Sequence, residues 1–348
     1  MKRNICLPAE WEPQSLVMLT WPHQATDWVP YLAEITETYV AMVDAITRHE
    51  GVVIATPHPI QVGALLSGRL TREQMTHVYL CYCKSNDTWA RDHGPITLVE
   101  RDTAKRTMLD FRFNGWGEKF EASLDNEITR TLHKDGAFDT EQGGTPRLAD
   151  NDDFVLEGGS IESDGKGTIF TTDFCLLAPN RNQPLEIEEI EEELKYRLKA
   201  SRIVWLHHGQ LIGDDTDGHI DTTVRIAPDD TLLYHKCYDK DDEQYADFAA
   251  LEEELKALKT IDGKSYHLIP LPQPDAILDD GDRLPATYAN FLVINCAVLV
   301  PTYAQPDNDK AACEAIAKAF PDREIIPIDS RTIVRQHGSI HCCTMQIP

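Results

Sequence analysis

Apolar residues recur at helical spacing in five separate stretches of the chain. These stretches cover residues 32–46, 124–132, 187–198, 248–258 and 312–319. Apolar side chains at positions i, i+3 or i+4 and i+7 place a hydrophobic stripe on one face of a helix. The pattern therefore predicts five comparable amphipathic helices.

Short β-rich segments alternate with these helices. Four of them follow a predicted helix closely, at residues 52–56, 203–206, 265–269 and 324–328, and further strand-like runs occur at 16–20, 78–81, 169–172, 222–226 and 291–294. Alternation of helix and strand predicts an α/β fold. The recurrence suggests one supersecondary unit repeated and closed into a ring, with a doubly wound sheet as the alternative.

Length and composition set the class of protein without naming a function. The chain has 348 residues, 42% hydrophobic and 26% charged, which is ordinary for a globular protein of one or two domains. It has no apolar run near the roughly 20 residues that cross a membrane, and its first ten residues lack the apolar stretch of a signal peptide. We therefore expect no membrane partner and a cytoplasmic location.

Charge and cysteine content narrow the partners. The nine cysteines are odd in number and scattered, which indicates reduced thiols rather than a disulfide framework. The formal net charge of −25 disfavours nucleic-acid binding and favours a small cationic ligand. The alternative is that the charge only keeps the protein in solution.

Residues 86–95 join two acids, an aromatic residue and an arginine in a turn after a predicted strand. Loops after strands often carry functional residues. A planar guanidinium requires a carboxylate for paired hydrogen bonds and an aromatic face for stacking, and Asp92 and Trp89 could supply them. The alternative is that Arg91 forms an ion pair inside a structural turn.

Glu157 stands at the end of an apolar strand and precedes two glycines. Glycines permit unusual backbone angles and close approach of a ligand, so this sequence predicts Glu157 at the rim of a pocket. A strand that simply ends in a turn is the alternative.

His219 and Asp221 are two residues apart, on the same side of the chain if this segment is extended. Both could then face one pocket, with His219 as general acid and base for a thiol elsewhere. The acidic loop 213–221 also invites a metal interpretation. It lacks the closing acid of a calcium loop, and the chain has no HExxH motif, so we expect no metal.

Cys342 and Cys343 lie near the end of the chain, shortly after Gly338. A cysteine acts as a nucleophile only as the thiolate, which needs a base or a positively charged setting. In an extended segment neighbouring side chains alternate, so only one of the two should face a pocket. A pair of buried structural cysteines remains the alternative.

Five motifs in this order resemble the agmatine deiminase family, which is grouped with the bacterial Porphyromonas-type peptidylarginine deiminases. The similarity spans nearly the whole chain, from Pro8–Pro13 and Trp21–Pro22 to Thr344, Gln346 and Pro348. The motifs are Trp89–Pro95, Glu157–Gly159, Asn180–Asn182, Asp214–Asp221 and Ile340–Cys342.

The resemblance implies a fold and a set of roles. The fold would be a five-bladed α/β propeller of guanidine-modifying enzymes, one domain over residues 1–348, with the site in a central channel. No metal or cofactor would be needed, and a homo-oligomer is an expectation by analogy. The implied roles are nucleophile for Cys342, acid and base for His219, guanidinium clamps for Asp92 and Asp221, and support of His219 and the substrate for Glu157, with Trp89, Asp87 and Asn114 as further substrate contacts.

The implied reaction is hydrolysis of agmatine to N-carbamoylputrescine and ammonia through a covalent amidino thioether, a step of putrescine biosynthesis. Two segments depart from the agmatine-enzyme pattern and border the expected substrate tail: Gln336–Ser339 replaces a glycine run, and Asn114–Gly117 precedes a shortened segment. Peptidyl-arginine deiminase, arginine deiminase and amidinotransferase are therefore alternatives. A non-catalytic binding protein of the same architecture and a metal hydrolase represent other classes.

Overall fold

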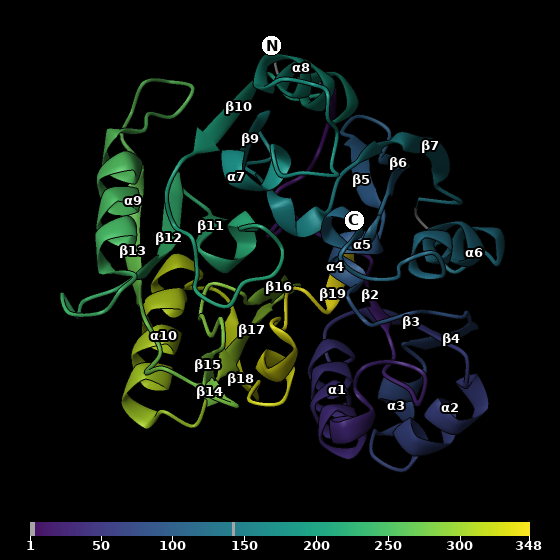
Figure 1. Cartoon of the computed structure of the whole chain (residues 1–348). Helices are drawn as coiled ribbons and strands as arrows, with labels where there is room; N and C mark the ends of the chain where they lie inside the picture. The colour runs from purple at the N-terminus through teal and green to yellow at the C-terminus, as the bar shows by residue number, and fades with distance from the viewer. Residues whose placement is uncertain (1–3, 141–142) are drawn as a thin grey trace.

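The computed structural model describes residues 4–140 and 143–348, which form a mixed α/β fold of small separate sheets (Figure 1). Residues 1–3, part of the chain start considered above, lie outside the described residues. Within the described ranges, no helix combines the length and the apolar character required to cross a bilayer.

Five of the sheets share one topology, in which two antiparallel strands are followed by a crossover helix and a parallel third strand. In the sheet that joins the chain ends, β19 (Thr344–Ile347) pairs with β2 (Leu16–Thr20), and α1 (Leu32–Ile46) leads to β3 (Gly51–Thr56). This sheet continues through α2 (Pro59–Ser67) and α3 (Arg72–Met75) to β4 (Val78–Tyr82).

The other four units repeat this order. They comprise β5 (Ile96–Glu100), β6 (Lys105–Arg112), α6 (Ile128–Lys134) and β7 (Arg147–Val155), with β1 (Ile5–Cys6) added at the edge; β8 (Ile161–Ser163), β9 (Thr168–Thr172), α8 (Ile187–Arg197) and β10 (Arg202–Leu206); β11 (Val224–Ala227), β12 (Thr231–Lys236), α9 (Tyr245–Ala257) and β13 (His267–Pro272); and β16 (Leu292–Ile294), β17 (Ala297–Thr302), α10 (Pro306–Ala319) and β18 (Glu324–Asp329). A short hairpin, β14 (Leu278–Asp279) and β15 (Asp282–Arg283), stands between the last two units.

The five predicted helices are confirmed, and each one is the crossover helix of a unit. The predicted strands are confirmed too, except that the one expected from residue 222 begins at Val224, because Ile220–Thr222 form a 3-10 turn. The doubly wound sheet is wrong, because the strands fall into several separate sheets instead of one continuous sheet.

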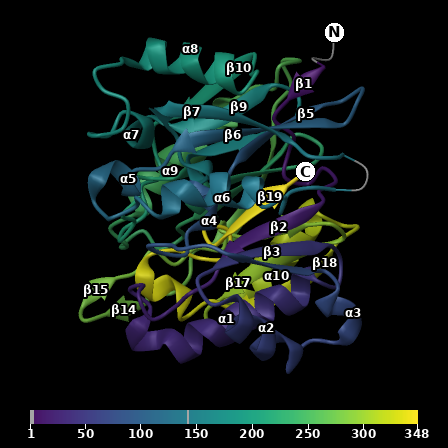
Figure 2. The same ribbon diagram turned by 90° about the vertical axis from the view of Figure 1, so that its right-hand side faces the viewer.

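The crossover helices lie around the outside of the molecule, whereas β19 lies near its middle (Figure 1). Figure 2 shows β19 beside β2, with α8 and α1 at opposite ends of that view. The buried face of α1, which includes Ile35, Tyr39 and Met42, packs into a cluster with the β2 and β3 side chains. Burying one such side chain stabilises the fold by about 1.5–3 kcal/mol.

Ile347→Ala tests the closure of the chain by β19. Ile347 is fully buried with Met18 and Val53, so the change should lower the free energy of unfolding by about 2–5 kcal/mol in urea titrations. Ile60 is 84% exposed, and Ile60→Ala should alter that free energy by about 0.5 kcal/mol or less. Equal effects of the two changes would contradict the role assigned to β19.

Candidate active site

A cavity of about 280 Å³ opens where several loops between the units meet. Its walls are acidic and aromatic, which suits a small organic cation. The lining residues are Asp27, Asp87, Trp89, Asp92, Trp116, Phe120, Asp215, Thr216, Thr222, Arg335, Gln336, His337, Gly338 and Cys342.

Cys342 lies in a hydrogen-bonded turn between β18 and β19, so the extended geometry considered for this segment is wrong. Its backbone N–H donates to Asn290 Oδ1 at 3.2 Å, and its carbonyl accepts from the N–H of Arg91 at 3.1 Å. Cys342 lines the cavity, whereas Cys343 is fully buried in the apolar cluster of α1. One of the two thiols therefore faces the site, as predicted.

Asp92 is presented by the single turn α4 (Ala90–His93). Its Oδ2 accepts from Trp116 Nε1 at 3.0 Å, and its Oδ1 accepts from the N–H of Gly159 at 3.0 Å. Burial, together with the Asp221 and Glu157 carboxylates, raises the pKa of Asp92 well above its usual value. Asp92 therefore holds a proton more readily than an ordinary aspartate.

His219 is held at the start of a short 3-10 turn, which corrects the extended segment expected from its spacing to Asp221. The turn forms because Thr216 Oγ1 accepts from the N–H of His219 at 3.0 Å and Asp214 Oδ2 accepts from the N–H of Gly218 at 2.6 Å. The Asp214 carboxylate thus stabilises the backbone of this loop. Burial is the main cause that lowers the pKa of His219 to about 4.

The two ring nitrogens of His219 are buried without a hydrogen-bond partner among the described residues. Nδ1 lies 3.7 Å from Asp92 Oδ1. A neutral imidazole with both nitrogens free can accept a proton from one reacting group and give it to another.

Asp221 lies next to the thiol, with its Oδ2 3.9 Å from Cys342 Sγ and 2.6 Å from His341 Nδ1. Its Oδ1 is buried without a partner in the described part of the chain. Burial alone would raise the pKa of Asp221, but the His341 hydrogen bond and the charges of His341, His219 and Arg225 keep it below its usual value. The pKa values of the two aspartates are therefore shifted in opposite directions.

Gly159 lies at the centre of these groups. A β-carbon on Gly159 would be 2.6 Å from His219 Nδ1, 3.0 Å from Asp92 Oδ1 and 3.1 Å from Asp221 Oδ2. The histidine and both aspartates therefore converge on one point, and the second glycine of the Glu157–Gly159 motif leaves room for them.

Burial and the neighbouring Asp221 and Asp92 carboxylates raise the pKa of the Cys342 thiol well above its usual value. The sulfur is therefore protonated at neutral pH. A cation bound between the two carboxylates would offset their charge and favour the thiolate.

Glu157 is fully buried, so its predicted position at the rim of a pocket is wrong. After β7 ends at Val155, the turn Gly158–Ser160 carries the chain inward, and Arg181 Nε lies 2.8 Å from Glu157 Oε1. Burial raises the pKa of Glu157, although Arg181 opposes this shift.

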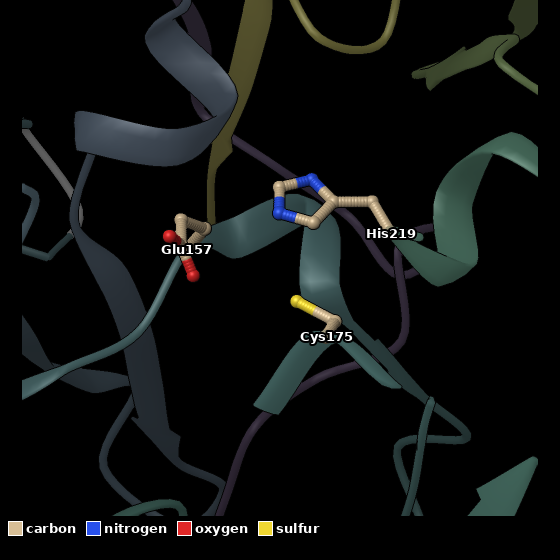
Figure 3. A group of neighbouring side chains, drawn as sticks. All are labelled: Glu157, Cys175 and His219. Carbon is tan, nitrogen blue, oxygen red and sulfur yellow. The ribbon is translucent and has the colours of Figure 1, made fainter. Parts of the chain in front are cut away.

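Among the residues that the structure describes, two groups of side chains have ligand atoms close enough for a metal ion. Glu157, Cys175 and His219 approach one another from three segments (Figure 3). Here the Arg181 guanidinium already pairs with Glu157. In the second group, Glu10, Glu162 and His341, the Arg225 guanidinium pairs with both glutamates. In both groups a guanidinium supplies the positive charge.

The further substrate contacts predicted from the sequence occupy different places. The rings of Trp89 and Trp116 both line the cavity, with centroids 6.4 Å apart. Asp87 also lines it, but accepts from Trp28 Nε1 at 3.1 Å and Trp89 Nε1 at 3.0 Å, and so braces the aromatic wall. Asn114 is absent from the lining and caps the turn α5 (Gly115–Glu118), accepting from the N–H of Gly117 at 3.0 Å.

Sequence reasoning assigned no role to several residues that support the site. Asn290 holds the Cys342 backbone, and its buried Nδ2 has no partner among the described residues. Arg181, Glu10 and His341 belong to motifs that carried the family resemblance, which was an available signal. Arg225 lies in an ordinary strand, and nothing in its surroundings along the chain marks it.

Comparison with known proteins agrees with this geometry. The model of the Porphyromonas-type peptidyl-arginine deiminase family matches residues 6–348. The agmatine deiminase of Medicago truncatula is 32% identical, with 98% of this chain and 96% of that protein covered.

Two solved structures are similar over their whole length. The first, a candidate arginine deiminase from Porphyromonas gingivalis, has a TM-score of 0.91 at 48% identity and covers 99% of this chain and 98% of its own. The second, an agmatine deiminase from C. jejuni with substrate bound, has a TM-score of 0.88 at 36% identity and covers 99% and 96%. From the family model and these relatives together, the chain belongs to the Porphyromonas-type peptidyl-arginine deiminase family.

Proposed function

We propose that this protein hydrolyses agmatine to N-carbamoylputrescine and ammonia. The observation that carries the proposal is the convergence of Asp92, Asp221 and His219 around Gly159, beside the Cys342 thiol, with Asp221 Oδ1 and both His219 nitrogens unpartnered in the described residues. Such a set can bind a flat cation by two opposed carboxylates and attack its central carbon.

In the proposed first step, the guanidinium binds between Asp92 and Asp221. Its positive charge favours ionisation of Asp92, whose proton is released to solvent, and of Cys342, whose proton passes to His219. The thiolate then forms a C–S bond with the guanidinium carbon. The C–N bond breaks as His219 returns its proton, and ammonia leaves.

In the second step, water attacks the amidino thioether. His219 takes a proton from the water, the C–S bond breaks, and the thiol is restored as the ureido product forms. Glu157, fixed by Arg181, is proposed to support the histidine and the bound guanidinium. The balance is one water consumed and one ammonia released for each guanidine.

The charges around the cavity favour agmatine over arginine. At the end opposite the guanidinium, agmatine carries only an amine, whereas arginine carries an amine and a carboxylate. Asp215 lines the cavity with no hydrogen bond on its carboxylate oxygens among the described residues, and suits an amine. Arg335 lines the same cavity, but it already has two partners. Its Nε lies 3.2 Å from Asp279 Oδ2, and its Cζ lies 3.7 Å from the centroid of the Tyr31 ring.

Free arginine or peptidyl-arginine is the second candidate substrate. It is favoured by the presence of Arg335 and His337 in the lining, where a carboxylate could bind. The names of the relatives are divided in the same way, between agmatine and arginine substrates.

We further propose that the five units close into a five-bladed propeller around a central channel, as one domain over residues 1–348. The shared topology of the five sheets and the lining of one cavity by the connections after β4, β10 and β18 support this. A homo-oligomeric state and a cytoplasmic location stay predictions.

The function is tested by incubating the purified protein with agmatine, arginine and an arginyl peptide, and measuring ammonia and the ureido product of each. Agmatine should react with the highest kcat/KM, and Cys342→Ala should abolish turnover while the far-UV circular dichroism stays unchanged. Reaction of only arginine or the peptide would overturn the substrate proposed. Unchanged turnover in Cys342→Ala would overturn the mechanism and favour a binding protein.

Gly159→Ala tests the convergence of the site. The new methyl would have to displace His219, Asp92 or Asp221, so kcat/KM for agmatine should fall by about 100-fold or more. Gly68 follows α2, where an added methyl meets only the Leu65 carbonyl at 3.4 Å and that of Ala64 at 3.8 Å, so Gly68→Ala should retain full activity. An active Gly159→Ala enzyme would place the chemistry elsewhere.

Asp215→Asn tests recognition of the substrate tail. Loss of the carboxylate should raise KM for agmatine by about tenfold and change kcat little, because the amine lies far from the reacting carbon. The matched control, Asp282→Asn, removes an acid of the β14–β15 hairpin outside the cavity lining. A KM that is the same in wild type and Asp215→Asn would exclude this contact.

A further inference from the structure

His341, the residue before Cys342, connects the active site to the N-terminal segment of the chain. Its side chain is completely buried, with Nδ1 2.6 Å from Asp221 Oδ2 and Nε2 2.7 Å from Glu10 Oε1. Glu10 lies in the loop between β1 and β2, more than three hundred residues away in sequence.

The two contacts require a proton on each side of the ring. Carboxylate oxygens are acceptors, and a neutral imidazole has only one N–H to donate. The chain Glu10–His341–Asp221 therefore binds one proton more than a neutral imidazole between two ionised carboxylates. Burial and the Arg225 and Arg91 charges lower the pKa of His341, while Glu10 and Asp221 oppose this, so the proton belongs to the three groups together.

The surrounding charges fit that additional proton. Two guanidiniums face Glu10: Arg91 Nη1 donates to its Oε1 at 3.1 Å, and Arg225 Nη2 donates to its Oε2. Arg225 also pairs with Glu162. In this cluster three carboxylates, those of Glu10, Glu162 and Asp221, stand against two guanidiniums, and one proton restores the balance.

Glu10, at one end of the hydrogen-bonded series Glu10–His341–Asp221, reaches a separate cavity. The Glu10 side chain is 17% exposed, and it lines this cavity with Arg91, Gly158, Met345 and Gln346, whereas His341 and Asp221 are fully buried. His341 therefore lies between the cavity lined by Cys342 and a second cavity whose lining does not include Cys342.

The contact decides how Asp221 is presented. The Asp221 Oδ2 is held by His341, and the Oδ1 is free. His219, Asp92, Cys342 and Arg225 are the other titratable or charged groups around Asp221, and among the described residues none of them holds Oδ1. A carboxylate fixed through one oxygen cannot rotate, so the other keeps its direction.

We propose that His341, gripped by Glu10, is a positioning residue that fixes Oδ2 of Asp221 and so presents the free Oδ1 to the substrate's guanidinium. The inference rests on the proposed function, since it gives that substrate a defined partner atom. It also assigns a role in the active site to the N-terminal segment.

Two substitutions of His341 separate its two contacts. The amide nitrogen of Asn can occupy the place of Nδ1, and that of Gln the place of Nε2. His341→Gln should leave Asp221 Oδ2 without its donor and lower kcat/KM for agmatine by about 10- to 100-fold, chiefly through KM. His341→Asn keeps that donor and should retain most of the activity.

The pH profile distinguishes positioning from a loss of packing. Without the donor, the pKa of Asp221 rises, so the acid limb of kcat/KM should move to higher pH in His341→Gln and stay near its wild-type position in His341→Asn. Glu10→Gln should move the limb in the same direction, since His341 then loses the charge that holds its proton. Glu12→Gln, two residues along the same segment and paired with Arg101, should leave the limb in place.

An experiment without substrate keeps the two proposals apart. Proton NMR of the wild type should show two downfield imidazole N–H signals that are lost in His341→Gln, with one of them shifted in Glu10→Gln. Failure of the wild type to hydrolyse any guanidine compound would overturn the proposed function even if these signals are present. Unshifted acid limbs, or equal losses in His341→Asn and His341→Gln, would overturn the role of His341 while leaving the function standing.

Discussion

Two carboxylates buried close together, Asp92 and Asp221, are the constraint on which the rest of the site depends. Two like charges in a place from which water is excluded strongly disfavour each other unless a cation lies between them. In this protein the two carboxylates have different hydrogen-bond donors. Asp92 receives two neutral donors and its pKa is raised, whereas Asp221 receives His341 and its pKa is lowered. A cation bound between the two acids would relieve their mutual repulsion.

The fold explains how residues far apart in the sequence reach this point. The residues assigned to the chemistry lie in connections between the last strand of one unit and the first strand of the next, whereas Trp116 and Phe120 of the aromatic wall lie inside a unit, between β6 and α6. Asp92 follows β4, Glu157 follows β7, and His219 and Asp221 follow β10. Asn290 precedes β16, and Cys342 precedes β19. The connections after β4, β10 and β18 line the cavity. Glu157 and Asn290, from the connections after β7 and β13, lie outside its lining and contact the site through Arg181 and the Cys342 backbone.

Elements with strong local patterns could be predicted from the sequence, and elements defined by their neighbours could not. The helix α1 has apolar residues at helical spacing and was predicted with its observed ends. The strand β7, with the sequence Arg147–Val155, is rich in acids and polar residues, and only its parallel pairing with β6 makes it a strand. Its β-structure depends on a partner that local patterning does not reveal.

The same distinction holds for the candidate site: the identities of its residues could be predicted from the sequence, but their local geometry could not. Cys342, His219, Asp92, Asp221 and Glu157 were named because thiol, imidazole and carboxylate chemistry can be read from residue types and motifs. What failed was local geometry: Glu157 is buried instead of at a rim, and the His219 and Cys342 segments are turns. The hydrogen bonds that cause these turns, such as that of Thr216 to His219, depend on backbone conformations that spacing does not encode.

The same pair of buried carboxylates explains why the Cys342 thiol would be reactive only when a cation is bound. Cys342 lies beside two acids, and its pKa is raised by burial and by their charge, so the protonated thiol is a poor nucleophile towards small electrophiles. A cation between the acids offsets part of their charge and thereby lowers the electrostatic penalty on the thiolate. A neutral compound of the same shape would leave the sulfur protonated. Selectivity for a cationic guanidine then arises from activation of the nucleophile as well as from binding, because the substrate itself supplies the charge that the site lacks.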